Sequence, residues 1–468
     1  MGNERKELNK TLNTGDVLVT AFGAMIGWGW VVSSGGWIQK AGVFGTMIAF
    51  LIGGIMIYFV GQTYAELTTA MPESGGAKVF TQKAFGPVGS FICTWAIILS
   101  YIGVVCFEAC SLPTIIQYIF SGFLKGYLYT IAGFDIYATW LVVAIGFAIL
   151  ITYINIRGIK AAARLQKVLT ITIAAVGIIL IVVSALKGDS TNLTGQMFVG
   201  QTSGSIVKNI LSVALVAPFF LFGFDVIPQA AEEINVPLKK LGKLLIFSIA
   251  LAVAFYGLVV FAVGYGMNST EVSNSVSGSG LVTADAMAKL FHSDVMAKIL
   301  IVGGMCGIVT SWNSFMIGGS RALMSMADSC MIPHVFAKTH PKYKTPHLAL
   351  ILIGIISIAS LFCGRVMLVW ISDSASFACC ISYCLVSMAF VKLRKIDPEM
   401  KRPYKVENYK LIGFFAVALS GFMCLMYMIP GSGCTLNIQE VIITVGWGIL
   451  GVLFAGVCKM KYKDKFGK

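Results

Sequence analysis

Long apolar segments recur along the whole chain, and they limit the possible folds more than any other feature of the sequence. Each segment is close to the roughly 20 apolar residues that an α-helix needs to cross a bilayer. Hydrophobic residues make up 57% of the 468 residues and charged residues only 12%, whereas an ordinary soluble domain carries about 25% charged residues. The chain has too little polar surface for a water-facing globule, so we predict an all-α membrane protein.

The apolar segments predict about twelve transmembrane helices in a single domain, 1–468. They are residues 16–37, 43–69, 88–120, 136–156, 165–186, 206–231, 244–267, 295–327, 347–363, 366–391, 411–430 and 438–458. The longest predicted external loop, 268–294, is rich in Ser, Asn and Gly.

The formal net charge of +14 indicates membrane topology and not nucleic-acid binding. With an even number of spans, most of the 35 Lys and Arg residues fall in loops on the side of the two termini. Because cytoplasmic loops carry an excess of Lys and Arg, both termini are predicted to be cytoplasmic in a multi-pass protein of the cell membrane. Membrane lipids are expected partners of the basic loops, and nucleic acid is not.

Two predicted spans contain residues that interrupt a helix. The first has Gly27 and Gly29 around a tryptophan, and the sixth has Gly223 and Asp225 followed by Pro228. In a helix interior glycine costs about 1 kcal/mol and proline about 3 kcal/mol. We therefore predict that helices 1 and 6 are broken in mid-membrane, although such glycines also serve close helix packing.

The two predicted breaks occupy matching positions, each in the first span of a group of five. This pattern indicates inverted repeats with a binding site at their interface. The first repeat is placed at 16–186, the second at 206–391, and two additional helices at 411–458.

Several short motifs resemble those of the amino acid–polyamine–organocation (APC) superfamily of permeases over about residues 14–459. They are 23–29 in the first span, 72–76 and 85–87 after the second, 222–225 and 231–233 in the sixth, and 311–313, 320–321 and 345–347 in and after the eighth. The resemblance implies two inverted five-helix repeats plus two further helices, and alternating access around a central site.

The resemblance also implies a function, secondary active transport of amino acids coupled to a cation. Three alternatives stay open. The first is a permease for an amine without a carboxylate, such as ethanolamine or a polyamine. The second is an amino acid/amine exchanger, and the third is a transporter-like sensor that binds its ligand without moving it. The main expected partner is the small-molecule substrate. The protein is expected to be a monomer or a weak oligomer.

The resemblance places the substrate-binding residues on three helices. Amides exposed at the first-helix break would bind a carboxylate, because half-helix N-termini carry partial positive charge. The residues concerned are Met25, Ile26, Gly27, Trp28 and Gly29 on the first span, Phe219, Phe222, Gly223 and Asp225 on the sixth, and Trp312 on the eighth. The aromatic residues among them could equally serve only to pack against neighbouring helices.

Glu108 is an acidic residue inside the third predicted span. An acid at the centre of a span costs at least about 2.5 kcal/mol, so it should be paired, protonated or functional. We predict that Glu108 binds a substrate ammonium or relays a proton, the alternative being a structural hydrogen bond. The same argument applies to Asp225.

The coupling ion is predicted from the eighth span. Gly307, Thr310 and Ser311 resemble a sodium-site pattern of one carbonyl and two hydroxyls, to which Gly23 and Ile26 would add two carbonyls. Sodium is favoured over protons because Ile173 stands where some proton-coupled relatives carry a lysine. Hydroxyls in membrane helices also simply bridge helices. No other cofactor is expected.

Enzyme function is not predicted. The four histidines lie in or beside loops, and no zinc-protease, phosphate-loop or nucleophile-elbow motif is present in the sequence. Arg321, Glu232 and Glu233 lie near predicted cytoplasmic helix ends, where they suit either inner-gate ion pairs or a plain interfacial role.

Overall fold

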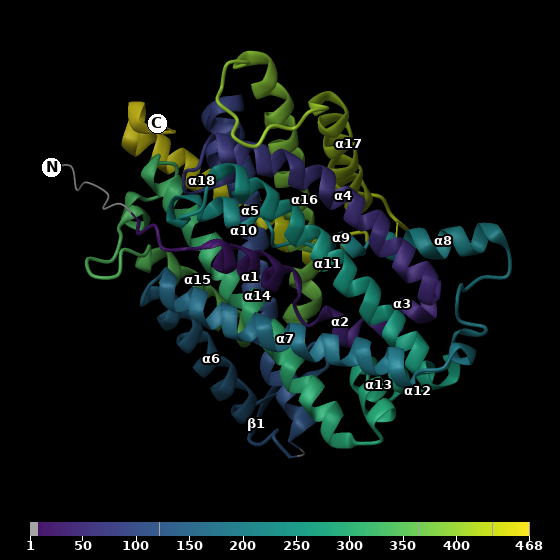
Figure 1. The fold of residues 1–468 in the computed structure, drawn as a ribbon. Helices are drawn as coiled ribbons and strands as arrows, with labels where there is room; N and C mark the ends of the chain where they lie inside the picture. Colours follow the sequence, from purple (N-terminus) through teal and green to yellow (C-terminus); the bar gives the residue numbers. More distant parts are fainter. Residues whose placement is uncertain (1–7, 121, 365, 433, 468) are drawn as a thin grey trace.

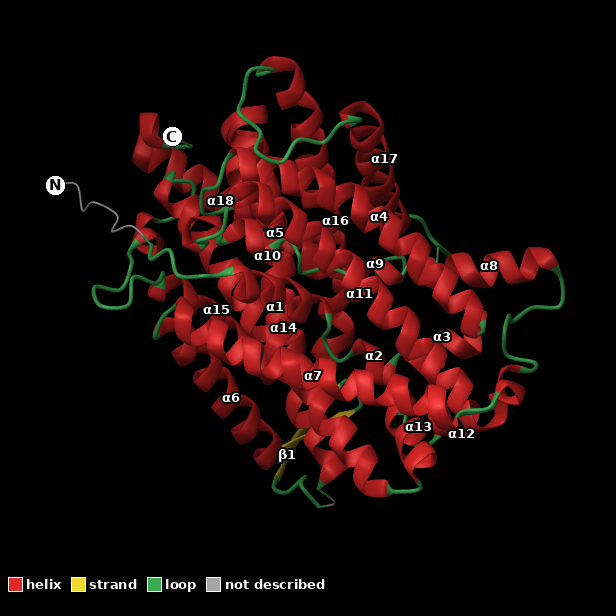
Figure 2. Ribbon diagram, viewed as in Figure 1, coloured by secondary structure: helices red, strands yellow, loops and turns green. Residues whose placement is uncertain are grey.

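Helices form nearly all of the protein, packed side by side in one bundle (Figures 1 and 2). The computed structural model describes residues 8–120, 122–364, 366–432 and 434–467. The elements are α1 (Thr14–Met25), α2 (Gly29–Val32), α3 (Ser34–Ala41), α4 (Val43–Ala70), α5 (Gly76–Ile119), β1 (Tyr127–Ile131), β2 (Phe134–Tyr137), α6 (Ala138–Ile156), α7 (Ile159–Lys187), η1 (Ser190–Leu193), α8 (Ser203–Ala214), α9 (Ala217–Phe220), α10 (Val226–Gln229), η2 (Ala231–Glu233), α11 (Leu238–Gly266), α12 (Ser269–Ser277), α13 (Val282–Phe291), α14 (Asp294–Asp328), η3 (His334–Ala337), α15 (His347–Leu361), α16 (Val366–Ile396), α17 (Tyr409–Met428), α18 (Ile438–Tyr462) and η4 (Lys463–Lys465).

Within the described residues, ten helical segments are long and apolar enough to cross a membrane. Two shorter apolar helices, α1 and α15, lie where the first and ninth spans are predicted. The structure thus supports an all-α, multi-pass membrane protein, as predicted. The count of twelve spans and the division into repeats remain predictions.

The first predicted span is interrupted as its glycines indicate. The Asn13 side chain accepts hydrogen bonds from the N–H groups of Gly15 (2.9 Å) and Asp16 (3.1 Å), and the Asp16 carboxylate accepts the Asn13 N–H in return. This capping box fixes the start of α1. The helix ends at Met25, and a new one begins at Gly29.

The sixth predicted span is also discontinuous. It consists of α8, α9 and α10, with residues 221–225 outside any helix. Gly223 has a φ of +126°, a conformation that strongly favours glycine. A Cβ at Gly223 would lie 2.7 Å from Ala24 Cβ, so the two interrupted segments touch at this glycine.

Three features differ from the sequence-based expectation. The predicted loop 268–294 forms α12 and α13, and a short antiparallel hairpin, β1–β2, lies between α5 and α6 (Figure 1). Helix α5 begins at Gly76, ahead of the predicted start at residue 88, and is kinked at Gly86, whose φ is +72°.

The broken segments lie at the centre of the bundle. Helix α1 contacts α7, α11 and α14, and α5 packs along both α14 and α16. The break after Met25 lies against side chains of α5, α11 and α14, and these helices build the site together with α16.

Candidate functional site

The break between α1 and α2 leaves backbone donors without partners. Among the described residues, the N–H groups of Gly27, Trp28 and Gly29 donate no hydrogen bond. The carbonyl of Met25, just before the break, accepts a hydrogen bond from the Tyr256 hydroxyl at 3.1 Å. Unpaired N–H groups at the start of a helix form a favourable site for an anion.

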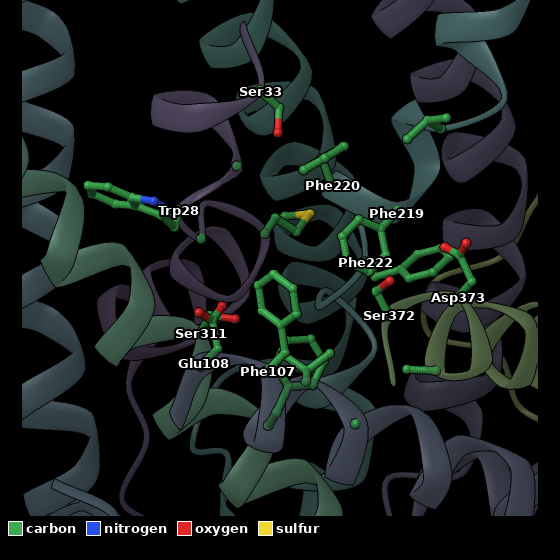
Figure 3. A pocket seen from close by; sticks show the side chains of 18 of the residues that line it. Trp28, Ser33, Phe107, Glu108, Phe219, Phe220, Phe222, Ser311, Ser372 and Asp373 are labelled. Atoms are coloured by element: carbon green, nitrogen blue, oxygen red, sulfur yellow. The ribbon is translucent and has the colours of Figure 1, made fainter. Parts of the chain in front are cut away.

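Glu108 projects from α5 against this break. A Cβ at Gly27 would lie 3.2 Å from Glu108 Oε1, and Ser311 lies beside the same carboxylate (Figure 3). Glu108 is only 4% exposed, and its Oε2 has no hydrogen-bond partner in the described part of the chain. A buried carboxylate with a free oxygen is suited to a cationic group of a ligand.

Aromatic side chains from the sixth segment form the opposite wall. Phe219, Phe220 and Phe222 lie together in the cavity (Figure 3). The Phe220 ring covers Gly29 so closely that a Cβ there would lie 2.3 Å from Phe220 Cε1. Sequence analysis selected Phe219 and Phe222 but missed Phe220.

The Trp28 ring points away from the centre of the cavity (Figure 3). It packs on Gly304 of α14, where an added Cβ would lie 2.5 Å from Trp28 Cζ3. The small residue at position 304 thus accommodates the ring, so Trp28 bounds the cavity without filling it.

These groups enclose one cavity of about 380 Å³. Its lining includes five predicted substrate residues on the first span and α5, namely Met25, Gly27, Trp28, Gly29 and Glu108. It also includes Ser311, which was predicted as an ion ligand, and Tyr256, Ser372 and Asp373, which were not predicted. None of the described lining residues is Lys, Arg or His.

Four predicted substrate residues lie outside the cavity lining, namely Ile26, Gly223, Asp225 and Trp312. Asp225 is 1% exposed and accepts hydrogen bonds from the hydroxyls of Tyr101 (2.5 Å) and Tyr383 (2.7 Å) and from the N–H of Gly223 (3.1 Å). This geometry suits a structural role at the break better than substrate contact.

The residues proposed for sodium gather between α1 and α14. Gly307 lies against the carbonyls of Ile26 and Gly27, where its Cβ would be 2.8 Å and 2.7 Å away. The Thr310 hydroxyl donates to the Gly307 carbonyl at 3.0 Å, and Thr310 Cβ faces Gly23. Carbonyl and hydroxyl oxygens suit a hard cation, so the residues present fit the proposed ion.

Helix α7 places further polar groups beside the proposed sodium site. Sequence analysis did not identify these groups. The Thr170 hydroxyl donates to the Val19 carbonyl at 3.2 Å, and the Gln166 carbonyl oxygen accepts from the Asn313 amide at 2.8 Å. Ile173 of the same helix contacts Gly307, so an apolar side chain occupies the position at which a lysine was considered.

Arg321 and Glu233 form a buried ion pair between α14 and η2. Nε donates to Glu233 Oε2 at 2.8 Å and Nη2 to Oε1 at 3.0 Å, and both side chains are 1% exposed. The N–H groups of Thr11 and Leu12 donate to the Glu233 carbonyl. The N-terminal segment, α14 and the end of the sixth segment are thus tied together.

A family model of amino acid permeases matches residues 12–454. The chain is 27% identical to the branched-chain amino acid permease BcaP of Bacillus subtilis (strain 168), over 90% of this chain and 88% of that protein. It is 26% identical to the methylthioribose transporter of the same strain, over 91% and 90%. The serine/threonine exchanger SteT of that strain is 25% identical, over 90% and 92%.

The chain therefore belongs to the amino acid permease family. The resemblance to the APC superfamily is confirmed, and the chain is a membrane transport protein and not an enzyme. The roles of individual residues remain proposals.

Proposed function

We propose that the protein is a secondary active transporter that moves amino acids across the cell membrane by alternating access. One observation carries the proposal: residues 27–29, whose N–H groups have no partner among the described residues, line the same cavity as the buried carboxylate of Glu108. An amino acid presents a carboxylate and an ammonium on one carbon atom. A site with donors and an acid side by side binds both groups.

In the proposed complex the substrate carboxylate accepts hydrogen bonds from the N–H groups of Gly27 and Gly29. The ammonium pairs with Glu108, and the side chain lies among Phe219 and Phe222. Hydrogen bonds to charged groups contribute about 1.5–3 kcal/mol each, which is enough to select zwitterions over neutral solutes.

Movement of the substrate requires that the cavity open to each side in turn. The contact of Ala24 with Gly223 joins the two interrupted segments, so movement of either segment displaces the other. The ion pair of Arg321 with Glu233 is proposed as an inner gate, which opens as η2 moves away from α14. The N-terminal segment is bonded to Glu233, so an inner gate there agrees with the proposal that both chain termini are cytoplasmic.

Sodium is the proposed coupling ion, held by oxygens of Gly23, Ile26, Gly307, Thr310 and Ser311. An ion at this place would touch the carbonyl side of the same break whose N–H groups bind the substrate. Occupancy of the ion site would therefore favour the geometry that binds the carboxylate.

A second candidate function is transport of an amine without a carboxylate, by uniport or exchange. It is favoured by the two acidic side chains of a cavity whose described lining has no basic residue.

Uptake by proteoliposomes tests both functions. Labelled neutral and cationic amino acids, ethanolamine and a polyamine are offered with and without an inward sodium gradient at fixed pH. Uptake of an amino acid that requires sodium is the expected result. Uptake of amines alone would overturn amino acid transport, and uptake indifferent to sodium would overturn the ion site.

A further inference from the structure

We propose that Asp373 binds a second cationic group of the substrate, so that the protein prefers solutes with two positively charged nitrogen groups. The inference rests on the proposed transport function and adds a substrate class to it. Lysine-like amino acids and aliphatic diamines share the required chemistry.

The cavity contains two carboxylates. Glu108 projects from α5 and Asp373 from α16, and Figure 3 shows them on different sides of the cavity. No Lys, Arg or His is present among the described lining residues. Acids at membrane depth are costly unless they are paired, so a cavity whose described lining has two acids and no basic side chain is suited to a ligand that supplies two cations.

Among the described residues, no basic side chain pairs with either carboxylate. Glu108 is buried, and its Oε2 has no partner in the described structure. The described residues also provide no hydrogen bond or ion pair to the Asp373 carboxylate. Both groups are therefore available to ligand atoms that enter the cavity.

The two acids lie at different levels along α5. Gly103 packs on α16 at Ile371 and Ala375, with its added Cβ 3.2 Å from Ile371 Cγ1 and 2.6 Å from Ala375 Cβ. Asp373 lies between those two residues in the sequence. Glu108 follows Gly103 by five residues, a rise of about 7.5 Å at 1.5 Å per residue.

This spacing separates the two ends of the substrate. The α-carboxylate and α-ammonium would lie at the 27–29 break and Glu108, and the distal cation at Asp373. Phe219 and Phe222 lie near the Asp373 side (Figure 3). Aromatic faces attract cations and also pack against methylene groups, so they suit an extended aliphatic chain that ends in a charge.

Competition for uptake tests the preference in the unmodified protein. Lysine and ornithine are compared with norleucine, which has the carbon chain of lysine but lacks the distal ammonium group, and with cadaverine, which lacks the carboxylate. Lysine is expected to compete at least about tenfold better than norleucine, the effect of one charge-assisted contact. Equal or better competition by norleucine would overturn the inference.

Variants then assign the preference to one side chain. Asp373→Asn is expected to raise the KM for lysine by about tenfold or more and to leave the norleucine KM within about twofold. Asp373→Glu, which keeps the charge, should retain lysine uptake. Asp294→Asn removes an exposed acid at the start of α14 and should change neither KM.

The outcomes separate this inference from the proposed function. Uptake of neutral amino acids that is equal in wild type and Asp373→Asn, with no lysine preference, would sink the inference alone. Asp373-dependent uptake of cadaverine without any amino acid uptake would support the second-cation site and overturn amino acid transport. If the Asp373→Asn variant does not fold, the competition between lysine and norleucine in the wild-type protein still tests the inference.

Discussion

Gly27 and Glu108 lie against each other, and a Cβ at residue 27 would be 3.2 Å from Glu108 Oε1. The unpaired N–H groups of the break and the buried carboxylate therefore act on the same small volume. In water such groups would be solvated separately. In a largely apolar cavity the low dielectric constant strengthens the electrostatic interactions of the N–H groups and of the carboxylate. A zwitterion binds to the N–H groups through its carboxylate and to Glu108 through its ammonium.

Glu108→Gln is expected to reduce amino acid uptake by about tenfold to a hundredfold, because a neutral amide loses the charged contact with the substrate ammonium. Uptake rates and KM values in proteoliposomes provide the measurement. Glu271→Gln, at the partly exposed start of α12, is the matched control. Unchanged uptake by Glu108→Gln would assign Glu108 to structure alone.

Gly223→Ala is expected to destabilise the protein by about 1–3 kcal/mol, because a non-glycine residue at this φ is strained. Its methyl group would also collide with Ala24. Thermal unfolding in detergent measures the loss. Gly257→Ala in α11 is the control, since its Cβ meets no atom within 4 Å and alanine is the better helix former. Equal stability of the two variants would contradict the prediction.

Asp225→Asn is expected to lower stability by about 1–3 kcal/mol, because an amide cannot accept from Tyr101 and Tyr383 as two carboxylate oxygens do. Substrate KM in the folded fraction should stay unchanged. A double-mutant cycle with Tyr383→Phe should show coupling, since the two residues share a hydrogen bond. A raised KM with unchanged stability would restore Asp225 as a substrate residue.

The spans and their breaks were predictable from the sequence because their signals are local. Apolar length defines a span, and glycine or proline weakens a helix wherever it stands. The helical nature of 269–277 was missed because composition was given more weight than capping. Asn268 followed by Glu271 is a capping box, a pattern that was readable in the sequence.

The cavity was predictable only in part, because its lining depends on which helix faces meet. Trp312 and Ser311 are neighbours in sequence, yet only Ser311 lines the cavity. Asp373 was overlooked although it is an acid within an apolar run, the same signal that identified Glu108. That Phe220 covers Gly29 follows from the packing of two distant segments, which a single sequence does not specify.

Thr310→Val is expected to raise the sodium concentration for half-maximal uptake by about tenfold or more, because it removes one oxygen from the proposed coordination sphere. Uptake measured over a range of sodium concentrations at fixed ionic strength tests this. Thr172→Val is the control, because this partly exposed residue of α7 donates, within the described structure, only to the Val168 carbonyl of its own helix. Sodium dependence equal in both variants would rule out Thr310 as a ligand.

Arg321→Ala is expected to destabilise the protein by about 3–5 kcal/mol, because it leaves the Glu233 carboxylate buried without its partner. Arg321→Lys should recover only part of the loss, since an ammonium cannot reproduce the paired contacts of a guanidinium. Lys289→Ala breaks the partly exposed pair with Glu271 and should cost at most about 1 kcal/mol.

Thermal unfolding and uptake together show whether Arg321 acts as a gate or only stabilises the fold. If the ion pair is an inner gate, Arg321→Lys should change the rate of substrate exchange across the liposome membrane more than it changes substrate KM. A variant with lower stability but an unaltered exchange rate would show that Arg321 and Glu233 only hold α14 to η2. The position of the pair, tied through Glu233 to the N-terminal segment, makes the exchange rate the more informative of the two measurements.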